Sequence, residues 1–240
     1  MKRIILLLVI VSILIPKQAT AQKDGAAIAA VAGGLLAIGA GIAAVKQMQE
    51  QAELTATQWV LANQPAMTSF SLKTLDFEGK KLKDMSSVSV ILFNIQEFKP
   101  MDKPELDGKK QVLFGFTSRG WINDQGIDFS KVNWMLIDSP EWLKMMTSYV
   151  KVASGQVNES HIKEALIAGK IVNKGVKGKG DLDIPFYKLG GDMYVVTDYS
   201  DEMKFIYNER SLGIFLKETR DLVQIGRSEI IKIHDFFFDE

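Results

Sequence analysis

Ser87-Val-Ser-Val-Ile-Leu-Phe-Asn-Ile-Gln-Glu-Phe98 is the stretch that decides the fold. Its apolar side chains do not alternate with polar ones but run without interruption from Val90 to Phe93. A strand with one solvated face alternates, whereas a strand covered on both faces is apolar almost throughout. The stretch therefore predicts a central strand that is buried on both faces.

Further strand patterns lie on either side of this run. Three of them are Ser69–Phe77, Gln111–Ser118 and Val132–Asp138. The last part of the chain predicts six more, at residues 184–188, 193–198, 203–208, 211–217, 221–225 and 229–237. Short turns such as Gly190-Gly191 and Asn208-Glu209-Arg210 join the later strands, which is typical of an antiparallel meander.

Two short helices are predicted between these groups of strands. Ser139-Pro140-Glu141 supplies an N-cap, a proline at the first helical position and an acid in the first turn. The apolar stripe of this helix consists of Trp142, Met145, Met146, Tyr149 and Val150. A second helix, Glu159–Ala168, is expected to bury Ile162, Ala165 and Leu166.

The predicted fold class is α+β: a long N-terminal Gly/Ala-rich helix, then a mostly antiparallel β domain with two short helices. The predicted organisation is a signal peptide at 1–21, an apolar helix that continues as an amphipathic helix at 22–65, and an α+β domain at 66–240. An alternative divides this domain near 139–170. We expect residues 66–240 to fold without the helix, because their strands and helices supply a core of their own.

The first 21 residues have the layout of a secretory signal peptide. Lys2 and Arg3 precede the apolar run Ile4–Ile15, and Ala19 and Ala21 have the spacing of a cleavage site. We expect cleavage after Ala21, with an uncleaved membrane anchor as the alternative. The protein is therefore expected to be exported, to the periplasm or to an envelope membrane.

A second apolar segment follows, Gly25–Val45, which has no charged or polar side chain. As a helix it would measure about 31 Å, the thickness of a hydrocarbon core. Small residues recur four apart, and we take Gly33, Gly34, Ala37 and Gly41 as candidates for close helix packing. The segment resembles the glycine-zipper stretches of bacterial envelope proteins over about 20 residues, which implies membrane association or self-association. A buried helix or a linker is the alternative.

Charge and cysteine content exclude several classes of protein. The chain has 29 basic and 29 acidic residues, and removal of the signal peptide takes away Lys2, Arg3 and Lys17. The remaining chain is mildly acidic, so we expect no nucleic acid among its partners. The absence of cysteine excludes disulfides, thiol chemistry and a lipid-modified cysteine.

Candidate chemical sites are few. Lys174, Lys177 and Lys179 lie in a glycine-rich stretch that could hold an anion, but the stretch lacks the context of a phosphate-binding loop and a hairpin loop is favoured. His161 would share a helix face with Glu164, but no third metal ligand accompanies them. His234 is expected on a solvated strand face. We therefore expect no metal and no cofactor.

The expected function is that of an exported envelope protein without enzymatic activity. It would associate with a membrane or with its own copies through residues 25–45, and its α+β domain would bind a protein partner or another ligand. The alternative is an envelope enzyme, a hydrolase that uses Asp or Glu together with Lys.

Overall fold

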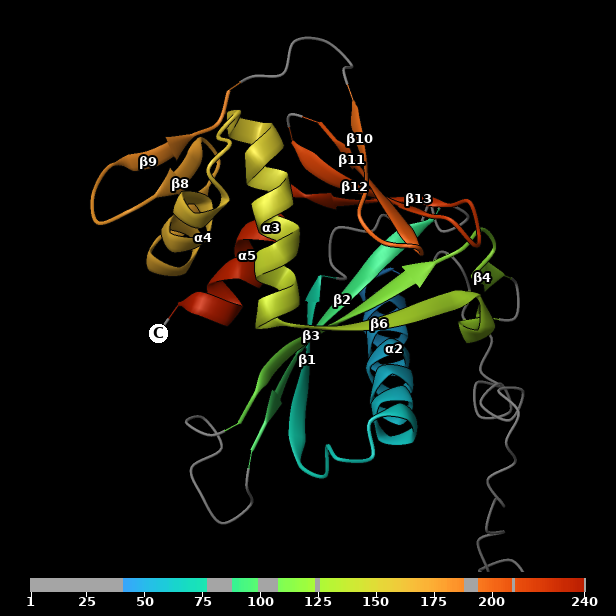
Figure 1. Ribbon diagram of the computed structural model, residues 1–240. Coiled ribbons are helices and arrows are strands. Elements are labelled where there is room, and N and C mark those ends of the chain that lie inside the picture. The colour runs from blue at the N-terminus through green and yellow to red at the C-terminus, as the bar shows by residue number, and fades with distance from the viewer. Residues whose placement is uncertain are drawn as a thin grey trace, which may run out of the picture. The chain divides into compact units, whose positions relative to one another are not determined.

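The computed structural model divides the chain into two compact units, residues 1–32 and residues 33–240. It describes residues 41–76, 88–98, 108–123, 126–187, 194–208 and 210–239, all of which belong to the second unit (Figure 1). The signal peptide predicted at 1–21 lies outside the described residues. The same holds for most of the apolar segment, including Gly33, Gly34 and Ala37, whereas Gly41 is the first residue of a described helix.

A four-stranded antiparallel sheet in the order β1-β2-β3-β6 forms the middle of the described structure. Its strands are β1 (Phe70–Asp76), β2 (Ser89–Glu97), β3 (Lys110–Thr117) and β6 (Val132–Asp138). The register places Leu92 opposite Phe114, and Phe114 opposite Met135. The run that begins at Ser87 therefore forms an inner strand, as predicted.

Side chains of this sheet supply two separate hydrophobic cores, one on each face. Val90 and Leu92 belong to one core, whereas Ile91, Phe93 and Ile95 belong to the other. All five are at most 4% exposed. Successive side chains of a strand point to opposite faces, so an uninterrupted apolar run fills both cores at once.

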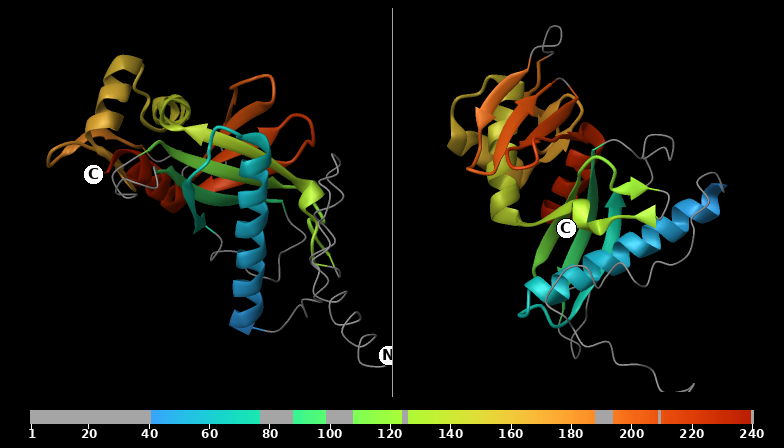
Figure 2. Two further views of the ribbon diagram at one scale, coloured as in Figure 1. Left: turned by 90° about the horizontal axis from the view of Figure 1, so that it is seen from below. Right: turned by 90° about the vertical axis from the view of Figure 1, so that its right-hand side faces the viewer.

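Helix α2 (Gly41–Asn63) covers one face of the sheet (Figure 2). It buries Met48, Ala52, Ala56 and Val60, which are four residues apart and form one stripe. Two alanines in the centre of the stripe let the helix backbone approach the sheet closely. In addition, the carboxylate of Glu53 accepts hydrogen bonds from the backbone amide and the hydroxyl of Thr74 in β1.

This packing changes what we expect of the fragment 66–240. Removal of α2 would uncover Ile91, Phe93, Ile95 and Leu113, all of which are fully buried beneath it. The helix is thus one wall of a core, and the fragment that retains a complete core is 41–240.

The opposite face of the sheet contributes to the larger core. That core also contains side chains of the helices α3 (Ser139–Ser154) and α5 (Arg227–Phe238) and of a second antiparallel sheet, β10-β11-β12-β13. The strands of the second sheet are β10 (Val195–Asp198), β11 (Met203–Tyr207), β12 (Ser211–Leu216) and β13 (Leu222–Gly226). They form an antiparallel meander from four of the six strands predicted in this part of the chain. The strand predicted at 184–188 overlaps β9 (Leu182–Pro185), which belongs to another sheet.

Helix α3 buries the predicted stripe, but it begins one residue earlier than expected. Asp138 is the N-cap, and its side chain accepts a hydrogen bond from the amide of Glu141 at 2.9 Å, so Ser139 and Pro140 lie in the first turn. Helix α4 (Glu159–Ala168) has the predicted bounds and buries the three predicted residues.

Two smaller sheets complete the described structure. The strands β7 (Lys170–Val172), β8 (Gly175–Lys177) and β9 (Leu182–Pro185) form a three-stranded antiparallel sheet. The short strands β4 (Ile122–Asn123) and β5 (Gly126–Ile127) form a hairpin, and the 3₁₀ turn η3 (Phe129–Lys131) leads from it into β6.

The prediction of a strand at 229–237 is wrong, because these residues lie in helix α5. Ile230, Ile233, His234 and Phe237 are buried at the spacing of one helix face. His234 is therefore a core residue that is 1% exposed, and it does not lie on a solvated strand face. A short apolar run is compatible with the two-residue period of a strand and with the 3.6-residue period of a helix. Here the burial of one helix face in the core favours the helix.

The predicted class is confirmed in its coarser form: an α+β protein with mostly antiparallel sheets and, among the described residues, four α-helices. Three of these helices follow residue 66, where the sequence predicted two. None of the helices in the described ranges is both long enough and apolar enough to cross a membrane.

The close contact between α2 and the sheet gives a first prediction. Ala52→Leu adds a branched side chain at a position with no exposed surface, and should lower the free energy of unfolding by about 1–3 kcal/mol. Leu54→Ala is the matched control on the same helix, because Leu54 is 54% exposed; it should change stability by less than about 0.5 kcal/mol. Urea denaturation measures both, and equal effects would contradict the packing.

Candidate functional site

A cleft of about 580 Å³ lies between the edge of the first sheet and the turns of the second. Strands β3 and β6 contribute Phe116, Asn133, Trp134 and Met135. The other wall consists of Asp201, Glu202, Met203, Leu216, Lys217 and Glu218. Phe116, Met203 and Leu216 are buried, so the floor is apolar, whereas the acidic residues of the rim are exposed.

The open edge of β6, rather than one of its faces, forms the first wall. Asn133, Trp134 and Met135 are consecutive, and consecutive strand residues point to opposite faces. The ring of Trp134 packs on the α2 side, with its centroid 6.4 Å from that of Trp59 and 6.0 Å from that of Phe93. Trp134 therefore turns its backbone, not its ring, toward the cleft.

The hydrogen-bond pattern shows which backbone groups of β6 face outward. The amide of Ser118 donates to the carbonyl of Lys131, and in an antiparallel ladder the bonded pairs recur at every second residue. Asn133, Met135 and Ile137 consequently bond to β3. Trp134 and Leu136 direct their amides and carbonyls away from the sheet, and no strand among the described residues pairs with that edge.

A second observation supports this assignment. The amide of Glu97 donates to the carbonyl of Lys109 at the far end of the β2–β3 pair. From this bond it follows that the odd-numbered residues of β3 form backbone hydrogen bonds with β2. The even-numbered residues of β3, such as Phe114 and Phe116, therefore bond to β6. Both ends of the sheet therefore give the same pattern.

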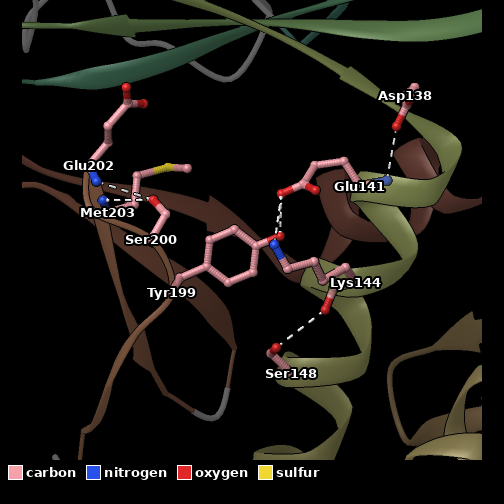
Figure 3. A network of polar contacts seen from close by, with 8 residues as sticks. All are labelled: Asp138, Glu141, Lys144, Ser148, Tyr199, Ser200, Glu202 and Met203. Atoms are coloured by element: carbon pink, nitrogen blue, oxygen red, sulfur yellow. Dashed lines mark hydrogen bonds and ion pairs between the residues drawn. The ribbon is translucent and has the colours of Figure 1, made fainter.

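The opposite wall includes the turn between β10 and β11, which several hydrogen bonds hold in place. The hydroxyl oxygen of Ser200 accepts hydrogen bonds from the amides of Glu202 and Met203, both at 3.2 Å (Figure 3). Lys217 fastens this turn to the end of β12: its Nζ donates to the carbonyl of Ser200 at 2.7 Å and lies 3.0 Å from Oδ1 of Asp198. The hydrogen bond from Lys217 lowers the pKa of Asp198.

Tyr199 ties the same turn to helix α3. Its hydroxyl donates to Oε1 of Glu141 (Figure 3). Its ring stacks on Phe205 with the centroids 4.1 Å apart. The Nζ of Lys144 lies 4.6 Å from the centre of the Tyr199 ring. Burial, together with the hydrogen bond to the Glu141 carboxylate, raises the pKa of Tyr199. This tyrosine stays neutral and acts as a structural donor.

The charge of the cleft is negative. Asp201, Glu202 and Glu218 are exposed on the rim, and none of them has an ion-pair partner among the described residues. The single lysine in the lining, Lys217, is already paired with Asp198, which lies outside the lining. The cleft therefore presents solvated carboxylates around an apolar floor, an arrangement suited to the recognition of a cationic group.

The described residues contain no group of three or more side chains placed to hold a metal ion. His161 instead lies with its Nε2 3.8 Å from Oδ1 of Asp183, and both side chains are partly exposed. The three lysines of the predicted anion loop lie at the two ends of β8. Lys174 lies in the turn between β7 and β8, Lys177 ends β8, and Lys179 lies in the turn before β9.

A second, much smaller hollow of about 90 Å³ lies beside α5 and is lined in part by His234, Lys170, Asp235 and Asp239. His234 is a link between three helices here. Its Nε2 donates to the carbonyl of Leu166 in α4 at 2.8 Å, and its Nδ1 accepts from Nε1 of Trp142 in α3 at 3.4 Å. Burial lowers the pKa of His234 to about 4. A neutral imidazole with both nitrogens occupied is a structural group.

Sequence reasoning did not find the cleft residues. Asp201, Glu202 and Glu218 lie in short turns between predicted strands, where acidic residues are ordinary. Their only common signal is that these turns lie at the same end of a meander, and the sequence does not reveal which edge of the other sheet faces them.

Comparison of the chain with protein-family models, with curated proteins and with solved structures gives no match in any of the three.

The buried His234 predicts a dependence of stability on pH. The unfolded histidine takes up a proton near pH 6.5, whereas the folded one does so only near pH 4, so protons favour the unfolded state between these values. The stability that His234 confers is therefore complete above pH 6.5 and falls as the pH is lowered toward 4, by up to about 3 kcal/mol.

Urea denaturation across this pH range measures the effect. His234→Gln, which keeps a donor and an acceptor, should show a smaller loss of stability on acidification than the parent chain. His161→Gln removes the other histidine and is the control. If the parent and His234→Gln lose stability in parallel, His234 does not cause the acid sensitivity.

Proposed function

We propose that this chain is a non-enzymatic binding protein whose α+β domain holds a ligand or a protein partner in the cleft beside β6. The observation that carries the proposal is the cleft itself, whose volume of about 580 Å³ lies within the usual range of ligand sites. Its apolar floor provides contact area, and its exposed carboxylates and open backbone groups provide a few directed polar interactions.

The surroundings of the acidic residues favour binding over catalysis. A hydrolase that relied on Asp or Glu would gain from a carboxylate removed from water, because burial adjusts the pKa of a general acid or base. Asp201, Glu202 and Glu218 are instead exposed to solvent. Lys217, the lysine of the lining, is held by Asp198 and Ser200 in a structural role.

We further propose that the protein is exported to the cell envelope, where residues 25–45 attach it to a membrane or to another copy. The support for export is the basic start, the apolar core and the Ala19/Ala21 spacing. The support for attachment is the length and small-residue content of the apolar segment. The α2 helix continues this segment and packs on the face of the sheet that does not supply the cleft floor.

The attachment can be tested by substitution of the small residues. Replacement of Gly33, Gly34, Ala37 and Gly41 by leucine should abolish self-association, because bulky side chains keep the helix backbones apart. The same change raises hydrophobicity and should leave membrane retention intact. Cross-linking of detergent-solubilised chain measures the first and carbonate extraction the second. A leucine variant that still oligomerises like the parent would show that the segment is a plain anchor or a linker.

Binding in the cleft can be tested with a variant that fills it. Asn133→Trp places an indole at the β6 edge, and Thr197→Trp on the exposed edge strand β10 is the matched control. The full chain is screened by thermal shift against short peptides, polyamines, sugars and nucleotides. At least one class should raise the Tm of the parent and of Thr197→Trp by about 5 °C at about 100 times its Kd, but not that of Asn133→Trp.

Two results would contradict this function. One is that every stabilising ligand raises the Tm of Asn133→Trp as much as that of the parent, which would show that the ligands bind outside the cleft. The other is turnover of ester, glycoside or phosphate substrates that Glu202→Gln abolishes, which would establish the hydrolase instead.

A further inference from the structure

We propose that the partner in this cleft is an extended, basic polypeptide segment that adds to the first sheet as a fifth strand, along the open edge of β6. The inference rests on the proposed function, because it assumes that the cleft is a binding site. It identifies the class of partner and the groups that would hold it.

The first support is the outer edge of β6, which pairs with no strand among the described residues. The outward amides and carbonyls of Trp134 and Leu136 are spaced as two successive bonding positions of a ladder, and an added strand would satisfy both. An edge strand with free backbone groups is a template for another strand unless something covers it. Here the cleft keeps the middle of the edge accessible.

The second support is the wall that faces this edge. An added strand would lie about 4.8 Å from β6 and direct every second side chain to the face on which Asn133 and Met135 lie. These side chains would meet the apolar floor formed by Phe116, Met203 and Leu216. The cleft thus offers side-chain contacts in addition to the ladder, as peptide sites of this kind require.

The third support is the charge of the rim. Asp201, Glu202 and Glu218 are three carboxylates without an ion-pair partner among the described residues. Lys217, the lysine of the lining, is paired with Asp198, which also pairs with Lys204 outside the lining. A strand that carries lysine or arginine would neutralise the three carboxylates, whereas an acidic strand would be repelled. A basic segment is therefore the complementary partner.

The edge of β10, an outer strand of the second sheet, lacks these features. All four residues of β10 are exposed, and so is the preceding Tyr194. Its edge does not line the cleft, so a strand added there would gain a ladder without the second wall. This difference favours β6 over β10 as the place of addition.

The test uses the full chain and a fluorescent seven-residue peptide of alternating lysine and valine. Its fully N-methylated form cannot donate backbone hydrogen bonds, and should bind at least about ten-fold more weakly, since each lost bond costs about 1 kcal/mol. A peptide of alternating glutamate and valine should not bind. Fluorescence anisotropy measures all three, and Asn133→Trp should abolish binding of the first.

Matched charge variants locate the peptide. Glu202→Gln combined with Glu218→Gln should weaken binding about three- to ten-fold. Glu164→Gln combined with Asp181→Asn removes two exposed acids from α4 and the β8–β9 turn, far from the cleft lining (Figure 1), and should leave the Kd unchanged. Binding should also weaken between about 50 mM and about 500 mM salt.

The outcomes separate this inference from the proposed function. Equal affinity of the N-methylated peptide overturns strand addition, and equal affinity of the glutamate peptide overturns the charge argument. If no peptide binds but another ligand stabilises the parent and not Asn133→Trp, the cleft is a binding site and the strand inference is wrong. If substitution of Asn133 affects the binding of no ligand, both the proposed function and the strand inference are wrong.

Discussion

The burial of β2 and β3 on both faces is the constraint on which the rest of the structure depends. Fully buried side chains such as Phe93 and Phe114 point to opposite sides of one sheet, and neither side can be left to solvent. The chain therefore has to supply two covering layers. Helix α2 provides one, and α3, α5 and the second sheet provide the other (Figure 2).

The position of the cleft follows from this arrangement. The inner strands are paired on both sides, so only the outer strands β1 and β6 present an edge. The second sheet covers the apolar face with its own core residues, but its turns lie beside β6 instead of pairing with it. Tyr199 and Lys217 hold these turns by contacts to α3 and to Asp198. The cleft is the gap between this strand edge and the turns of the second sheet.

The sequence predicts the local elements of this fold better than their arrangement. The continuous run from Val90, the stripe of α3 and the strands of the meander follow from periods of 2 and 3.6 residues, which a sequence records directly. The C-terminal helix was missed, because the run Ile230–Phe237 is apolar at both periods and the core contacts of His234 decide between them. The cleft could not be predicted, since it joins residues of four separate segments through tertiary packing.

The most direct measurement is amide hydrogen exchange along β6 in the full chain, followed by NMR with and without the lysine–valine peptide. In the free protein the amides of Trp134 and Leu136 should exchange faster than those of Met135 and Ile137, which bond to β3. Addition of the peptide should slow Trp134 and Leu136 selectively. Slow exchange of both amides in the free protein would contradict the open edge. Unchanged exchange of both amides at saturating peptide would contradict the added strand.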